Sequence, residues 1–70
     1  MRELSQSIIK ALAKKYKAQM AESAANIAVY MNNPAGIGEH PEVLEAIDSQ
    51  VAKYAEAEEK LHALGSIIDG

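Results

Sequence analysis

Glu58 and His62 are the residues whose types and spacing come closest to a reactive site. They stand four positions apart, so a helix would place the carboxylate and the imidazole one turn apart on one face, as in the metal centres of helical bundles. Di-iron carboxylate bundles use Glu-x-x-His motifs and further inward glutamates, whereas the first half of the chain offers Glu3 and Glu22 off its apolar stripe. We therefore predict that the chain has no metal site. Glu58 and His62 are the candidate ligands in the alternative that it does bind a metal. In the interpretation without a metal, the Glu58 carboxylate bonds to the Tyr16 hydroxyl or to a nearby lysine.

A second group of potential ligands lies in the segment NNPAGIGEHPE, residues 32–42. Glu39, His40 and Glu42 carry the oxygen and nitrogen donors that bind divalent metals. Neighbours in sequence rarely converge on one ion, and the start of a helix accounts for the same residues through capping and dipole complementarity. We therefore predict no metal site here.

The glycines of this segment do not form a phosphate-binding fingerprint. The GIG at 36–38 is too short, no strand precedes it, and G-x-G-x-x-G would need a third glycine where Pro41 stands. We interpret residues 33–40 as a turn in which the glycines take unusual backbone angles and Ile37 lies between the helix ends.

The composition argues against catalysis. The chain has 70 residues, two histidines and no cysteine, which excludes thiolate nucleophiles, disulfides and sulfur-bound zinc. No Ser/His/Asp or paired-carboxylate arrangement suited to hydrolysis can be assembled, and so short a chain leaves no room for a deep pocket. We predict a non-enzymatic protein without a cofactor.

No apolar run approaches the roughly 18 residues that a membrane span requires, so we expect no membrane partner and a cytoplasmic location.

Charge is divided unevenly along the chain. The net charge of −3 argues against nucleic acid as an obligatory partner, because phosphate contacts require a positive surface. Residues 1–32 carry five basic and two acidic side chains, for +3, and residues 33–70 carry two basic and eight acidic ones, for −6. This division suits either a basic arm for an anion or two segments that lie side by side, and we prefer the second. The arm would consist of Lys10, Lys14, Lys15 and Lys17.

Residues from about 3 to 32 predict one long helix, because they lack Gly and Pro and are rich in good helix formers. At about 100° per residue, an apolar stripe follows one face. It comprises Ile9, Leu12, Ala13, Tyr16, Met20, Ser23, Ala24, Ile27, Tyr30 and Met31. Pro34 ends this helix near Asn32, because it forces Asn33 out of the helical region.

A second helix is predicted from about 41 to 64. Pro41 suits the first helical position, and Gly65 is placed as the C-terminal glycine, which leaves 65–70 as a short tail. The apolar stripe comprises Val43, Leu44, Ile47, Val51, Tyr54, Ala55, Leu61 and His62, with Glu58 in its middle.

The short connection between these helices favours antiparallel neighbours. A turn at 36–38 pairs positions whose numbers sum to about 74, so that Ile27 meets Ile47 and Met20 meets Tyr54. The same register lays the lysines at 14–17 beside the acidic residues near Glu58, mostly with favourable sign. The chain is predicted to be all-α, a single antiparallel two-helix hairpin domain.

A hairpin of this size buries only one seam, and a chain this short buries about 60% of its unfolded surface. Self-association is the usual remedy, and a twofold pair of hairpins forms a four-helix bundle. We predict a homo-oligomer, either a dimer or a tetramer, and leave a further protein partner open. The predicted oligomer interface comprises Ile9, Leu12, Tyr16, Met20, Ile27, Tyr30, Val51, Tyr54 and Leu61.

A strip of small side chains on the first helix is either a second contact surface or a solvated face of good helix formers. It comprises Ala11, Ala18, Ala21, Ala25 and Ala28, with Val29 beside them.

The segment from Asn33 to Leu64, above all NPAGIGEHPEVLEAID followed by KYAEAEEKLHAL, resembles the C-terminal part of short uncharacterised helical proteins encoded by tailed phages of marine bacteria. The resemblance covers about half of the chain and supplies no catalytic or binding residue. It implies a small phage-encoded protein that acts in the infected cell, in the host cytoplasm, or in particle assembly.

The leading hypothesis from sequence is a non-enzymatic, self-associating helical protein with a structural or adaptor role. The first alternative is a metal-binding helical bundle that uses Glu58 and His62. The second is a nucleic-acid-associated protein that uses the four lysines of the first helix.

Overall fold

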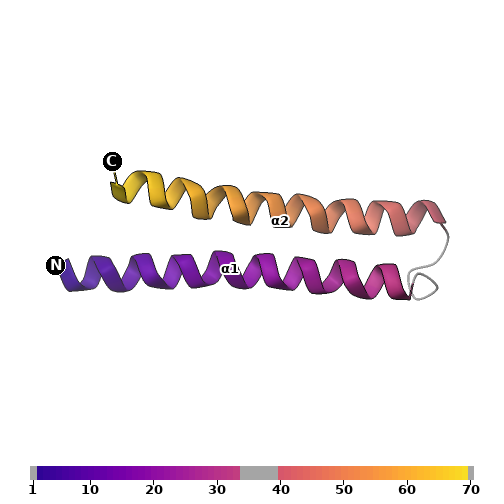
Figure 1. Cartoon of the computed structure of the whole chain (residues 1–70), viewed down its shortest axis with the longest axis horizontal. Helices are drawn as coiled ribbons and strands as arrows, with labels where there is room; N and C mark the ends of the chain where they lie inside the picture. The colour runs from indigo at the N-terminus through magenta and orange to yellow at the C-terminus, as the bar shows by residue number, and fades with distance from the viewer. Residues whose placement is uncertain (1, 34–39, 70) are drawn as a thin grey trace.

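Two long helices make up the described part of the chain. The computed structural model describes residues 2–33 and 40–69, in which α1 spans Arg2–Asn32 and α2 spans His40–Asp69. The helices lie side by side and antiparallel, so that α1 begins and α2 ends at the same end of a rod (Figure 1). The rod measures 52 × 18 × 12 Å along its principal axes. The prediction of an all-α antiparallel hairpin is confirmed.

The end of α1 lies where the sequence predicts it, at Asn32. The backbone N–H of Asn33 donates to the carbonyl of Val29 at 2.9 Å, and Nδ2 of Asn32 donates to the carbonyl of Ala28 at 2.8 Å. The first bond satisfies a carbonyl group that the last turn of the helix would otherwise leave without a partner. The chain then leaves the helix immediately before Pro34, as the steric restriction on the preceding residue requires.

The end of α2 differs from the prediction. The helix continues through Gly65 to Asp69, and Oγ of Ser66 donates to the carbonyl of His62 at 3.3 Å within it. A glycine ends a helix when it takes the left-handed conformation, and Gly65 does not take it. Ile67 and Ile68 therefore belong to the last turn of α2 and are exposed there, instead of forming a separate tail.

A seam with alternating steps of four and three residues joins the helices. In α1 it comprises Ile9, Ala13, Tyr16, Met20, Ser23, Ile27 and Tyr30. In α2 it comprises Val43, Ile47, Gln50, Tyr54, Ala57, Leu61 and Leu64. All of these residues are buried or half-buried, and their spacing is the seven-residue repeat of a coiled coil.

The predicted stripes are wrong at positions that directly follow a seam residue. These exposed positions are Ala24, Met31, Leu44, Val51, Ala55, Glu58 and His62. The predicted stripes have a spacing of 3.6 residues per turn, whereas the seam follows a seven-residue repeat. The two patterns diverge by about 20° per heptad, so a predicted stripe moves off the seam along the helix. It also omits Gln50 and Ala57, which are polar or small and nevertheless occupy the seam of α2.

The centre of the seam is narrow and partly polar. Ser23, Gln50 and Ala57 are the most buried side chains, at 3%, 8% and 2% exposure, and small residues here let the helices approach closely. Nδ2 of Asn26 donates to Oε1 of Gln50 across the hairpin. The residue numbers of this pair sum to 76, so the register lies two positions from the expected sum of 74.

Neither helix, over the residues described, contains a stretch long and apolar enough to cross a membrane.

Candidate interaction surface

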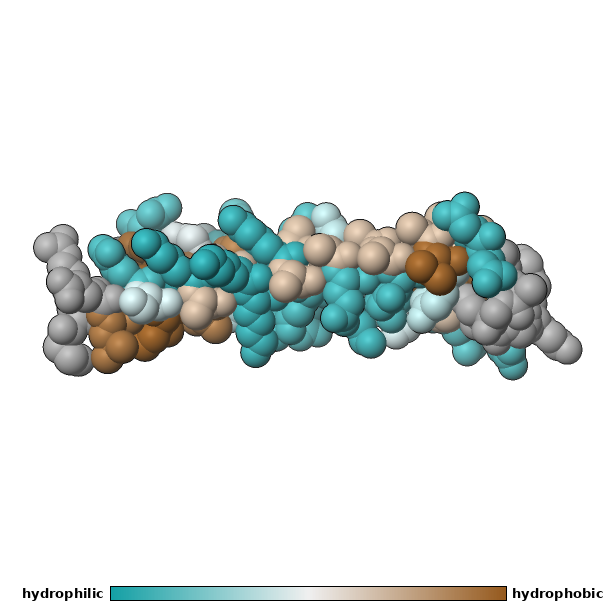
Figure 2. All heavy atoms as spheres, turned by 90° about the horizontal axis from the view of Figure 1, so that it is seen from below, coloured by the Kyte–Doolittle hydropathy of each residue, from teal (hydrophilic) through white to brown (hydrophobic). Residues whose placement is uncertain are grey.

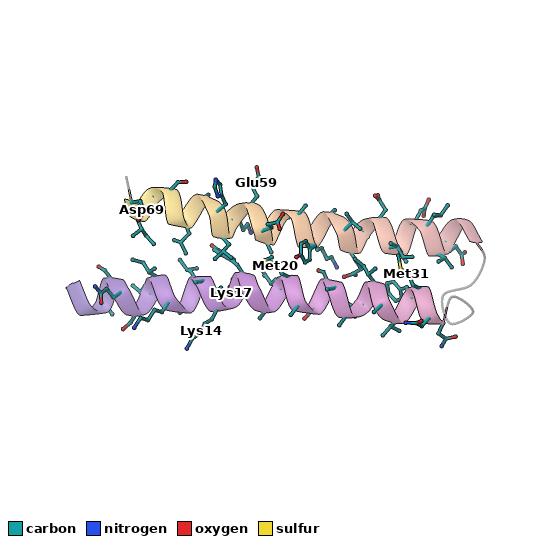
Figure 3. The ribbon with its side chains drawn as sticks, viewed as in Figure 1. Lys14, Lys17, Met20, Met31, Glu59 and Asp69 are labelled. Atoms are coloured by element: carbon teal, nitrogen blue, oxygen red, sulfur yellow. The ribbon has the colours of Figure 1, made fainter. Side chains whose placement is uncertain are left out.

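An apolar surface continues the seam on one broad side of the rod. We call it the apolar flank, and it consists of Ala24 and Met31 from α1 with Leu44 and Val51 from α2. Each of these residues directly follows a seam residue that begins a four-residue step, and in two antiparallel helices such positions share one side. Met31 projects from the last turn of α1 toward α2 (Figure 3). Both helices thus contribute to one continuous surface.

The apolar flank is exposed to a degree that isolated surface residues do not explain. Met31 is 64% exposed, Leu44 is 58% exposed and Val51 is 49% exposed. Single exposed apolar residues are common on soluble proteins, whereas contiguous apolar patches mark sites of interaction. These three side chains are contiguous along the seam, so they fit the second description.

A shallow hollow of about 290 Å³ lies at the end of the apolar flank that is farther from the loop. Its lining comes from both helices and comprises Ala24, Ile27, Val51 and Tyr54. Ile27 and Tyr54 are half-buried seam residues whose outer edges reach the surface at this point. The hollow presents almost no polar group to a ligand, so it is shaped to receive an apolar side chain.

The opposite broad side of the hairpin carries polar residues near the middle of the rod. A hollow of about 270 Å³ there is lined by Gln19, Glu22, Ser23, Lys53, Glu56 and Ala57. Asn26 and Gln50 form their hydrogen bond near this level of the rod. The two sides of one seam therefore differ in chemistry at this level of the rod.

Charged residues extend the apolar flank toward the chain ends. Lys17 follows the seam residue Tyr16 and Glu58 follows the seam residue Ala57, so both occupy the same side as Met31. Both side chains are exposed. The flank is therefore apolar near the loop and carries Lys17, Glu58 and, nearer the chain ends, Lys10 farther along the rod.

The predicted pairing of basic and acidic segments across the hairpin does not take the form of ion pairs. Within the described residues, no lysine of α1 lies at ion-pair distance from a carboxylate of α2. Lys14 points away from α2 and Glu59 points away from α1 (Figure 3). The ion pair in this region lies within α2, between Nζ of Lys60 and Oε1 of Glu56 at 3.0 Å.

Lys60 also links the two helices through an aromatic contact. Its Nζ lies 6.0 Å from the centroid of the Tyr16 ring, at the outer limit of a cation–π interaction. The hydrogen bond and the charge of Glu56 raise the pKa of Lys60 above its ordinary value. Tyr16 therefore has Lys60 as its charged neighbour, where the sequence suggested Glu58.

The candidate metal ligands of α2 do not assemble a coordination sphere. Glu58 and His62 are exposed and line a shallow hollow together with Ala55 and Glu59, all on one helix. Over the residues described, no group of three or more His, Asp or Glu side chains comes close enough to hold an ion. Glu58 and His62 are thus brought together without a third ligand.

Several predictions of the sequence fall on residues outside those described. They concern the conformation of the glycines at 36–38, the position of Ile37 and the side chains of Glu39 and His40.

Of the residues predicted for the oligomer interface, Val51 lies on the apolar flank and the other eight are half-buried in or beside the seam. The sequence does indicate the flank. One seam needs apolar residues at two of every seven positions, and Met31, Leu44 and Val51 are additional apolar residues beside those positions.

The chain matches no protein-family model, and no curated protein and no solved structure is significantly similar to it.

Proposed function

We propose that this protein is a non-enzymatic, self-associating helical hairpin with a structural or adaptor role. Two hairpins would cover their apolar flanks against each other and form a four-helix bundle. The observation that carries the proposal is the exposed row of Met31, Leu44 and Val51 beside a hollow made by both helices. A surface of this kind is stabilised when another apolar surface removes it from water.

The burial inside one hairpin supports the same proposal. Among the described residues, Ala57 is the single apolar side chain that is fully buried. Small domains have little core to begin with, and chains of this length commonly gain the missing burial from oligomerisation. Helices of bundles carry apolar residues at about three of seven positions, which corresponds to the seam plus one flank.

The resemblance of residues 33–64 to phage-encoded helical proteins supports a role in the infected cell or in particle assembly. On this proposal the hairpin acts in the host cytoplasm, where it joins copies of itself or holds a protein partner. The support is analogy, because the matching residues include no reactive group.

Size-exclusion chromatography with light scattering tests the proposal at micromolar concentrations. We expect the mass of a dimer or a tetramer for the unchanged chain, and a shift to monomer for Val51→Glu, which places a charge in the apolar flank. Val29→Glu is the matched control, because Val29 is 59% exposed and lies on α1 outside the flank. A folded monomer of the unchanged chain would overturn the proposal. Dissociation by Val29→Glu alone would assign the contact to the alanine strip instead.

A nucleic-acid-associated function is the second candidate, and the exposed lysines of α1 favour it. Lys10, Lys14, Lys15 and Lys17 are all exposed, and none pairs with a carboxylate of α2. Binding through these groups would weaken steeply as salt rises, because each phosphate contact releases counterions. Electrophoretic mobility shift at low ionic strength tests this function, and the absence of retardation for both DNA and RNA would remove it.

A further inference from the structure

We infer that the second copy docks flank to flank about a twofold axis that runs along the rod, with both loops at the same end. This arrangement rests on the self-association proposed above and specifies its geometry. Each α1 then lies against α2 of the other copy. Every helix in the resulting four-helix bundle has antiparallel neighbours, as in bundles with up-and-down topology.

The heights of the flank residues along the rod lead to this arrangement. The contacts of Asn26 with Gln50 and of Lys60 with Tyr16 fix which residues of α1 and α2 share a level. In that register Met31 lies level with Leu44, and Lys17 lies level with Glu58. A twofold axis along the rod keeps every residue at its own height. It therefore sets Met31 opposite Leu44 of the second copy.

Charge selects this axis over the alternative. Under the same rotation, Lys17 of each copy meets Glu58 of the other, so that these two charged groups gain a partner of opposite sign. A twofold axis perpendicular to the rod would bring each α1 against the other α1. Lys17 stands at the midpoint of α1 and would then lie within a turn of its own counterpart. Because Glu58 is level with Lys17, it would likewise lie near the Glu58 of the second copy.

The size of the broad side is sufficient for a stable contact. The rod presents a side of 52 × 18 Å, and two flat sides of that size cover more than the roughly 800 Å² per partner found in standard interfaces. Ala24 and Val51 have short side chains in the half of this side next to the loops, which lets the two hairpins approach closely there. The bulky Met31 and Leu44 lie nearer the loops.

Disulfide trapping tests the orientation, and the chain suits it because it contains no cysteine. Met31→Cys mixed with Leu44→Cys should form a disulfide-linked pair of different chains, identified by a mass tag on one of them. The control mixture is Val51→Cys with Gly65→Cys, which would form the linked pair only about the perpendicular axis. A side chain at Gly65 meets no atom within 4 Å, so this variant should keep the fold.

We expect the first mixture to cross-link at least about tenfold faster than the second. Faster cross-linking of the control mixture, or a dimer that forms neither disulfide, would overturn the orientation while the proposed self-association stands. A light-scattering mass of one chain would overturn the self-association itself. Circular dichroism of each variant establishes that it has kept its helices.

Charge reversal gives an independent measurement of the same geometry. Lys17→Glu or Glu58→Lys alone should weaken the dimer by about tenfold in Kd, because like charges then face each other twice. The double variant should recover the original Kd. Lys14→Glu with Glu59→Lys is the matched control, because both side chains point outward from the hairpin (Figure 3). An unchanged Kd for Lys17→Glu would contradict the proposal, since the perpendicular axis sets like charges together before and after that substitution.

Discussion

Asn26 and Gln50 form a side-chain hydrogen bond across the hairpin, with Nδ2 of Asn26 3.2 Å from Oε1 of Gln50. Gln50 is buried in the seam of α2, whereas Asn26 is half-buried beside the seam of α1. A polar contact inside an apolar seam favours one register over its neighbours, because sliding the helices would leave the Gln50 amide without its partner.

A double-mutant cycle measures this contact. Asn26→Ala and Gln50→Ala should each lower the free energy of unfolding, and their coupling should be about 0.5 to 1.5 kcal/mol, the net contribution of one hydrogen bond. Urea unfolding followed by circular dichroism supplies the four free energies. Asn32→Ala is the control, because Asn32 bonds locally to Ala28 and should show no coupling to Gln50.

The close approach of the helices at Ala57 predicts that a larger side chain is not tolerated there. Ala57→Leu should destabilise the hairpin by about 1 to 3 kcal/mol, because the added methylenes force the helices apart. Ala52→Leu adds the same atoms at an exposed position of the same helix and should have little effect. Equal thermal unfolding of the two variants would show that the seam is open at Ala57.

Gly65 offers a stabilising substitution. It lies within α2, does not take the left-handed conformation, and has open space where a Cβ would stand. Gly65→Ala should therefore raise the free energy of unfolding by about 0.5 to 1 kcal/mol, because glycine loses more backbone entropy in a helix than alanine does. A loss of stability in urea unfolding would indicate that α2 ends at this glycine.

The ion pair between Lys60 and Glu56 predicts a pH dependence at alkaline pH. Glu56 holds the pKa of Lys60 above the ordinary value of 10.5 by a hydrogen bond and by its charge. A raised pKa in the folded state means that the pair contributes fully below pH 10.5 and loses its contribution as the pH rises through the pKa of the folded state. NMR titration of Lys60 should show this pKa falling in Glu56→Gln. Glu59→Gln should leave it in place, and an equal shift in both variants would contradict the assignment to Glu56.

Metal analysis addresses Glu58 and His62. Protein purified without an affinity tag should contain no stoichiometric iron, manganese or zinc, because the described residues bring no third ligand to this pair. Glu58→Ala should leave the metal content unchanged. Stoichiometric metal that is lost in Glu58→Ala would establish the metal-binding bundle instead.

Those parts of the fold that depend on local chemistry could be predicted from the sequence. Pro34 fixes the end of α1 at Asn32, and two long segments without helix-breaking residues joined by a short connection predict an antiparallel hairpin. The end of α2 could not be predicted in this way, because glycine is compatible with both a helix and a cap, and the surrounding helix decides between them.

The orientation of each helix about its axis was harder to predict than its length. The seam includes Gln50 and Ala57, which no count of large apolar residues would select, whereas Leu44 and Val51 have the right chemistry and lie outside it. Two apolar faces compete in α2, and the choice between them depends on packing against α1. Figure 2 shows apolar surface near both ends of the rod that the packing of the two helices leaves exposed.

The placement of charge was predicted only in outline. Lys14 and Lys17 of α1 lie in the same half of the rod as Glu59 of α2 (Figure 3), as their positions in the sequence suggest. Long side chains at exposed positions gain little from pairing, and their direction is set by the helix on which they stand. Lys14 and Glu59 therefore point outward, although their segments are neighbours.

The hairpin shape has a mechanical consequence. Because α1 begins where α2 ends, a pulling force on the two ends would act across the seam at that end and open it one layer after another, as a zipper opens. Each step would break only a few contacts, so the molecule should yield at low tension. A load along the 52 Å axis, applied to one helix against the other, would have to shear all the layers together and should meet much greater resistance.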